Sequence, residues 1–138
     1  PLTGVQREIL NPDELAPPSG FNHGVLVDGG KTLYLAGQDA SGPDAEIVAP
    51  DDLVGQFEQV LSNLSTVVEE AGGSSNDIVK LNVFVADRDE YRDNLDELGD
   101  VFGRYFDDYP AMALFEVADF FADDARIEME GFAVVDDG

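Results

Sequence analysis

Apolar residues alternate with polar ones, or cluster, in six short segments that are typical of β-strands. Gly, Pro and Asn residues between these segments mark turns. We expect strands at residues 5–10, 23–27, 32–36, 78–86, 111–118 and 126–135. The run Asp28-Gly29-Gly30-Lys31 separates the second segment from the third. Because Asp-Gly between β-forming runs is a strong turn signal, these two strands are predicted to form a hairpin.

Two further segments have apolar residues at intervals of three and four, the spacing of an amphipathic helix. The first covers residues 51–71, with Asp51 as the expected N-cap and Gly72-Gly73 as the expected end. The second covers residues 89–106. Its expected inner face consists of Leu95, Leu98, Val101, Phe102 and Tyr105.

The order of these elements, β-β-β-α-β-α-β-β, predicts an α+β fold in which residues 1–138 form a single domain. Two helices cannot cover both faces of a six-stranded sheet. We therefore expect a six-stranded mixed sheet with both helices on one face. The other face would carry exposed apolar side chains, which predicts an oligomer.

The two C-terminal strand segments resemble the signature of the Rid/YjgF family of small imine and enamine deaminases. They contain Pro110-Ala111-Met112, Glu116-Val117-Ala118 and Ile127-Glu128-Met129-Glu130. Phe21-Asn22-His23-Gly24-Val25 and Leu35-Ala36-Gly37-Gln38 also match family usage in the same order. The resemblance covers nearly the whole chain. It implies a chorismate-mutase-like (YjgF-like) fold, a homotrimer whose sheets form a central barrel, and clefts between subunits that bind a small molecule.

The resemblance also assigns roles to individual residues. In deaminating members, an arginine follows Pro-Ala and binds the substrate carboxylate, and Met112 stands at that position here. Glu128 corresponds to the glutamate that helps to place the attacking water. Backbone groups near Gly37 correspond to those that share this task. Phe21 corresponds to the aromatic residue that closes the cleft, and Leu114 is a further ligand-binding position. No cofactor and no metal are implied.

Met112 has two interpretations, since its side chain is neutral and donates no hydrogen bond. Either it fills the cleft, or it makes the pocket accept an uncharged or apolar ligand. A lost hydrogen bond to a charged group is worth about 1.5–3 kcal/mol, or roughly one to two orders of magnitude in affinity. Arg126 also has two interpretations. It precedes Glu128 by two residues and therefore projects from the same strand face, where it would replace the missing cation. Alternatively, it lies in solvent at the end of the strand.

Glu128 is the expected catalytic group. Without an arginine nearby its pKa is predicted to rise, which suits a general acid or base. Glu130 is expected on the same strand face, whereas Glu116 and the single His23 are interpreted as structural. Two functions remain open. One is a hydrolytic deaminase of small imines or enamines, such as 2-imino acids, with altered substrate choice. The other is a non-catalytic trimeric protein that binds a small ligand or a partner.

The chain is strongly acidic, with 30 Asp and Glu against 7 Lys and Arg and a net charge of −23. So few cations disfavour nucleic acid and anionic membranes as partners, and we do not extend to this chain the ribonuclease label that some family members carry. With no Cys and one His, no metal-ligand spacing is found. No apolar run reaches the roughly 18 residues of a membrane span, and the first residues lack a signal-peptide pattern. A cytoplasmic protein is expected.

The acidic surface is typical of a halophilic protein from a cytoplasm that contains molar salt. At about 1 M salt the Debye length is only about 3 Å, so the mutual repulsion of the carboxylates is screened. In dilute buffer it is not, and the folded state is destabilised. We therefore expect the melting temperature to fall when KCl is lowered from molar to millimolar concentration. A melting temperature that is independent of salt would contradict this prediction.

Overall fold

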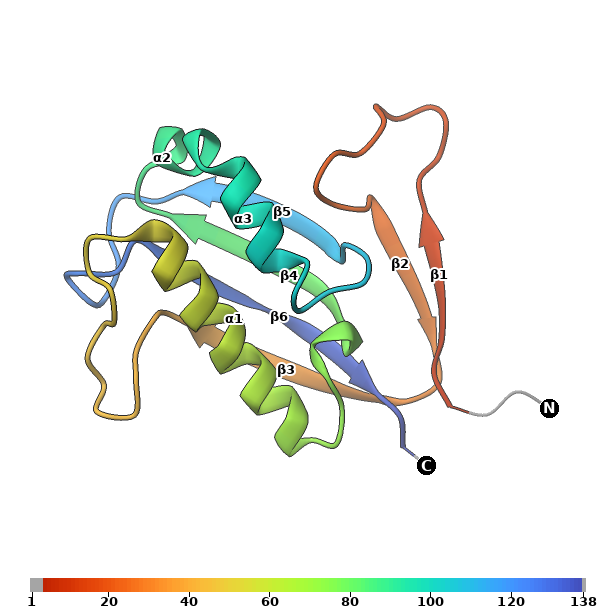
Figure 1. Cartoon of the computed structure of the whole chain (residues 1–138). Coiled ribbons are helices and arrows are strands. Elements are labelled where there is room, and N and C mark those ends of the chain that lie inside the picture. Colours follow the sequence, from red (N-terminus) through yellow and green to blue (C-terminus); the bar gives the residue numbers. More distant parts are fainter. Residues whose placement is uncertain (1–3, 138) are drawn as a thin grey trace.

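The computed structural model describes residues 4–137 and has an α+β fold (Figure 1). The predicted class is therefore confirmed. The elements follow in the order β1 (Gln6–Leu10), β2 (Gly24–Asp28), β3 (Lys31–Gln38), α1 (Leu53–Glu70), a 3₁₀ turn (Ser75–Asp77), β4 (Ile78–Val85), α2 (Arg88–Asp93), α3 (Leu95–Phe102), β5 (Ala111–Glu116) and β6 (Ile127–Val135).

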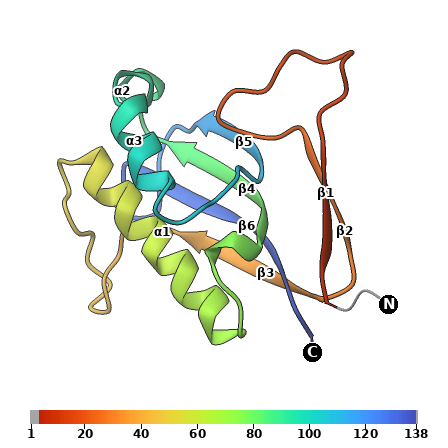
Figure 2. The same ribbon diagram turned by 45° about the vertical axis from the view of Figure 1, so that its right-hand side comes forward.

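The central layer is a four-stranded mixed sheet with the strand order β3-β6-β4-β5. Strands β4 and β5 are parallel, whereas β6 is antiparallel to both β3 and β4. All three helices lie on one face of this sheet, and the other face is left open by them (Figures 1 and 2). The core lies between the helices and the sheet, and its fully buried members include Val60, Leu64, Leu81, Val83 and Met129.

The prediction of one six-stranded sheet is wrong, because β1 and β2 form a separate two-stranded sheet beside the main one (Figure 2). The predicted hairpin between the second and third strands is wrong for the same reason. Its turn is locally correct, since Gly29 and Gly30 both have positive φ values, of +79° and +80°. However, a Cβ on Gly30 would lie 2.7 Å from Val134 of β6. The turn is therefore packed against β6, which pairs with β3 directly after it.

Helix α1 ends at the predicted glycines, and its N-cap lies one residue later than predicted. Gly72 has a φ of +89°, and the Gly73 N–H donates to the carbonyl oxygen of Val68 at 3.0 Å. This is the pattern of a Schellman motif, in which glycine tolerates the left-handed conformation. At the other end Asp52, rather than Asp51, is the N-cap residue, and its side chain makes no capping hydrogen bond.

The second predicted helix is interrupted at Asn94, which separates α2 from α3. Nδ2 of Asn94 donates to the carbonyl oxygen of Glu90 at 2.7 Å, a local side-chain bond of the kind that competes with helix continuation. Leu98 is buried as expected, but Leu95 is 55% exposed. In the described part of the chain, no helix has the length and apolar character that crossing a membrane requires.

Candidate functional site

Strand register places Met112 and Leu114 on the helix-covered side of the sheet. Met112 pairs with Leu81 and Leu114 with Val83 across the parallel ladder of β5 and β4. Leu81 and Val83 are fully buried beneath the helices. Because side chains directly opposite each other point to the same face, Met112 and Leu114 also face the helices.

A cavity of about 200 Å³ lies over this part of β5. Its walls come from the loop before β2, from β4, from the two short helices and from β5. They include Phe21, Val83, Tyr91, Leu95, Met112 and Leu114. The structure thus brings together three of the residues predicted from sequence, namely Phe21, Met112 and Leu114.

The buried side chain of Asn22 holds Phe21 at this cavity. The Asn22 backbone N–H donates to the carbonyl oxygen of Pro110 at 3.1 Å, directly before β5. Its Nδ2 donates to the carbonyl oxygen of Tyr109 at 2.6 Å, and its Oδ1 accepts a bond from Asn11. Buried polar groups in proteins are normally hydrogen-bonded, and the bonds of Asn22 fix the loop against the start of β5.

Tyr91 is a pocket residue that the sequence reasoning missed. Burial, and to a smaller extent the neighbouring Tyr109, raises the pKa of the Tyr91 hydroxyl to about 12. The phenol is therefore neutral at any physiological pH and retains its O–H donor. The one available signal was an isolated aromatic residue within the charged run of residues 87–93.

Glu128 and Gly37 lie on the opposite, open side of the sheet. Glu128 pairs with Phe84 on β4, whereas its neighbour Met129 is buried under the helices. A Cβ on Gly37 would lie only 2.6 Å from Oε2 of Glu128. The register of β3 against β6 shifts at this point, between Leu35 and Gln38. Glycine and the local bulge therefore let the carboxylate lie directly against the β3 backbone.

The carboxyl group of Glu128 has a raised pKa, as predicted. Partial burial is the main cause, followed by the negative charges of Asp39 and Glu130. The repulsion from Glu130 agrees with the prediction that both glutamates share one face of β6. Because Glu128 has acidic neighbours and a raised pKa, it can take up and release a proton closer to neutral pH than an ordinary glutamate.

The five predicted site residues thus form two groups rather than one. Phe21, Met112 and Leu114 belong to the helix-side pocket, and Gly37 and Glu128 belong to the open face of the sheet. The body of the sheet separates the two groups within one chain. A single cleft that contains both groups therefore requires a second copy of the protein.

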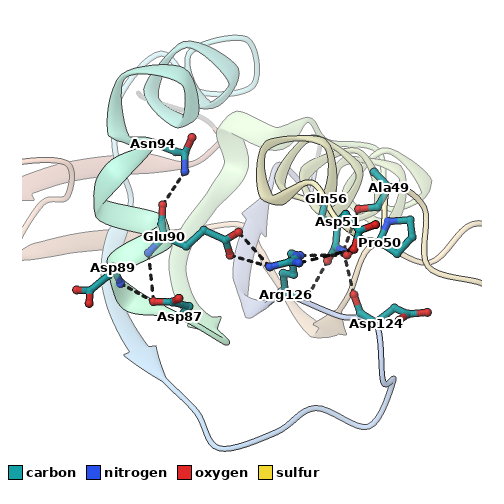
Figure 3. Close-up of polar contacts among 10 residues, drawn as sticks. All are labelled: Ala49, Pro50, Asp51, Gln56, Asp87, Asp89, Glu90, Asn94, Asp124 and Arg126. Carbon is teal, nitrogen blue, oxygen red and sulfur yellow. Dashed lines mark hydrogen bonds and ion pairs between the residues drawn. The ribbon is translucent and has the colours of Figure 1, made fainter.

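Arg126 occupies neither of the two places expected from sequence (Figure 3). Its Nη1 donates to the carboxylate of Glu90 at 3.0 Å, and its Nε donates to the carbonyl oxygen of Pro50 at 3.0 Å. Its Nη2 lies 3.8 Å from Asp51. The guanidinium joins α2 to the start of α1, so it is neither free in solvent nor available to replace the missing cation beside Met112.

Fully buried Gln56 supports the same region (Figure 3). Its Oε1 accepts the backbone N–H of Arg126 at 2.8 Å, and its Nε2 donates to the carbonyl oxygens of Asp124 and Ala49 at 3.0 and 3.1 Å. These bonds connect the loop before α1 with the loop before β6. Arg126 and Gln56 together therefore have a structural role.

His23 and Glu116, the two residues interpreted as structural from the sequence, both make contacts that connect parts of the fold. Nε2 of His23 lies 2.8 Å from the carbonyl oxygen of Ala16, and its ring packs edge-on against Phe21. Glu116 accepts the backbone N–H of Arg88, the first residue of α2, at 2.8 Å. Within residues 4–137, no three His, Asp or Glu side chains are grouped so that they could hold a metal ion.

Comparison with known proteins gives a consistent result over nearly the whole chain. A family model described as Endoribonuclease L-PSP matches residues 12–135. A 2-iminobutanoate/2-iminopropanoate deaminase of Capra hircus is 30% identical over 135 residues, which are 96% of this chain and 93% of that protein. A RutC family protein of Pyrococcus abyssi is 29% identical, covering 94% of this chain and 98% of that protein. The crystal structure of a Rid-family protein of unknown function from Yersinia pestis aligns with a TM-score of 0.81 and 31% identity, covering 94% of this chain and 98% of that one.

The raised pKa of Glu128 predicts how the stability of the fold depends on pH. The folded protein holds the Glu128 proton more tightly than the unfolded chain, so this group stabilises the fold below the ordinary glutamate pKa. That contribution is lost as the pH rises through the folded-state pKa. We expect Glu128→Gln to melt at a higher temperature than the parent at pH 7 in molar KCl, and the difference to shrink as the pH falls below about 4. A parent that is the more stable of the two at pH 7 would contradict this prediction.

Proposed function

Because the chain belongs to the Rid/YjgF family, we propose that it is a hydrolytic deaminase of small imines or enamines whose substrate choice is altered by Met112. The observation that carries this proposal is Glu128, a carboxyl group of raised pKa held against Gly37 on the open face of the sheet. Relatives at about 30% identity are named 2-iminobutanoate/2-iminopropanoate deaminases, which supports the reaction type.

The proposed assembly is a homotrimer in which the open sheet faces of the three copies meet in a central barrel. Aromatic pairs on that face support this arrangement. The rings of Tyr34 and Phe132 are 5.0 Å apart and those of Phe84 and Phe115 are 5.8 Å apart. Tyr34 is 76% exposed and Phe115 is 49% exposed in the single chain. Burying such side chains against another copy is favourable by about 25 cal/mol per Å² of apolar surface.

In this assembly the catalytic site is shared between copies. Glu128 and the Gly37 backbone of one copy face the pocket around Met112 of the next. The separation of the two groups by the sheet supports this division, because neither group is complete without the other. Glu128 is then the acid–base group, and the walls around Met112 select the substrate.

The proposed reaction needs one proton-transferring group and no cofactor. Water adds across the C=N bond, its oxygen bonding to carbon while Glu128 removes one of its protons and passes it to nitrogen. Glu128 then removes the hydroxyl proton of the resulting carbinolamine and passes it to nitrogen, and ammonia leaves as the C–N bond breaks and the C=O bond forms. Glu128 ends in its starting protonation state.

A non-catalytic ligand-binding protein is the second candidate function. The observation that favours it is the pocket lining, which contains no charged side chain. A carboxylate would find no cation there, so the best-known substrate type of the family would bind poorly. The two candidates are separated by whether the parent protein turns over any imine.

The test is an imine-hydrolysis assay in molar KCl. A 2-imino acid would be generated by a salt-tolerant amino-acid oxidase, and an imine without a carboxylate by a flavin-dependent amine oxidase. We expect the parent to hydrolyse the uncharged imine, and Met112→Arg to gain activity on the 2-imino acid. Glu128→Gln should lower kcat by about 100-fold or more, the usual contribution of general acid–base catalysis. Glu130→Gln, a change of the same kind on the same strand face, is the control and should retain most activity. A parent that is inactive on both imines would favour the binding protein.

A further inference from the structure

The pocket around Met112 contains uncharged side chains only. None of the chain's 7 Lys and Arg residues lines it. Arg126 is bound to Glu90, Arg104 lies 3.5 Å from Glu58, and Arg7 lies 2.7 Å from Asp77, all outside the pocket. A ligand carboxylate would therefore enter a site without a counter-charge, in a protein with a net charge of −23. Both effects disfavour an anion.

The same pocket extends inward as an apolar space. A second cavity of about 80 Å³ adjoins it and shares Tyr91, Leu95 and Met112 with it. Phe57 and Phe102 form the deeper wall of this space. The combined volume is smaller than the roughly 300–1,000 Å³ that is usual for drug-sized ligands, so the site fits a small molecule with a short apolar chain.

Tyr91 lies where the two cavities meet. Its ring packs against Phe57, with 6.4 Å between the ring centroids. The Tyr91 hydroxyl takes part in none of the hydrogen bonds of residues 4–137, and since no fully buried side-chain oxygen there lacks a partner, this hydroxyl is not fully enclosed. By contrast, the hydroxyl of Tyr105 donates to Glu58 at 3.0 Å. Tyr91 thus lines both cavities and carries a hydroxyl without a hydrogen-bond partner in the described part of the chain.

We propose that this pocket selects an uncharged ligand with a short apolar chain, and that the Tyr91 hydroxyl donates the hydrogen bond that orients it. The inference rests on the proposed function, since it names the substrate class of the same site. Tyr91 is a specificity-determining residue in this account. An amide oxygen or an imine nitrogen accepts such a bond, and the ligand chain contacts Met112, whose flexible thioether adapts to its shape.

The two methionines of the chain make the test direct. Met112 lines the pocket, whereas Met129 is fully buried in the core. With ¹³C-methyl-labelled methionine in molar KCl, the spectrum has one signal from the site and one internal control. The probes are butanamide and butanoate, which have the same chain and nearly the same shape but differ in charge.

We expect butanamide to shift the Met112 methyl signal in a saturable way and to leave the Met129 signal unchanged. Butanoate should bind at least about 10-fold more weakly. Tyr91→Phe should weaken butanamide binding by about 2- to 10-fold, the size of one neutral hydrogen bond. Tyr105→Phe, which removes a hydroxyl outside the pocket, is the matched control and should leave the affinity unchanged. Met112→Arg, which lacks the reporter methyl and is therefore titrated by calorimetry, should reverse the preference in favour of butanoate.

Equal or tighter binding of butanoate by the parent would overturn the inference, and so would the absence of any saturable shift with butanamide. Unchanged affinity in Tyr91→Phe would remove the role of the hydroxyl. The titration involves no catalysis. A failed selection for the amide is therefore distinguishable from a failed deaminase function, which the comparison of Glu128→Gln with Glu130→Gln tests separately.

Discussion

The alternation of side chains across β4, β5 and β6 determines the arrangement of the whole site. Leu81, Val83 and Met129 must face the helices, because the core is built from them. The face on which each ladder partner places its side chain is then fixed. Met112 lies on the helix side with Leu81, and Glu128 lies on the open side with Phe84. A shift of one residue in either strand would expose the core, so the two groups of candidate site residues are fixed on opposite faces by the same packing that holds the sheet together.

Charge distribution adds a second constraint to the site. Glu128 has Asp39 and Glu130 as neighbours instead of a cation, and its pKa is raised accordingly. The replacement cation considered from the sequence, Arg126, is held by Glu90 and by the carbonyl oxygen of Pro50. Both observations agree with a site whose ligand has no negative charge. The acidic character of the protein therefore extends to its proposed chemistry as well as to its surface.

Sequence patterns predicted the features that depend on local interactions. The end of α1 at Gly72 follows from the conformational freedom of glycine, and the strand positions in β4 and β6 follow from their apolar residues. The partner of β3 was not predictable in this way. The turn at Gly29-Gly30 forms as expected, but pairing with β6 depends on residues a hundred positions away. The division of five site residues into two groups likewise required the strand register. Tyr91 was missed because a single aromatic residue in a charged helix has no motif around it.

The central claim is that two copies of the chain complete one site. The most direct measurement mixes two inactive variants, Met112→Trp, which fills the pocket, and Glu128→Gln. Neither should hydrolyse an uncharged imine alone. If the site is shared, unfolding both variants together and refolding them in molar KCl should restore about a quarter of the parent activity, since that fraction of sites in a random mixture joins an intact pocket to an intact glutamate. Mixed trimers that are as inactive as their parents would contradict a shared site.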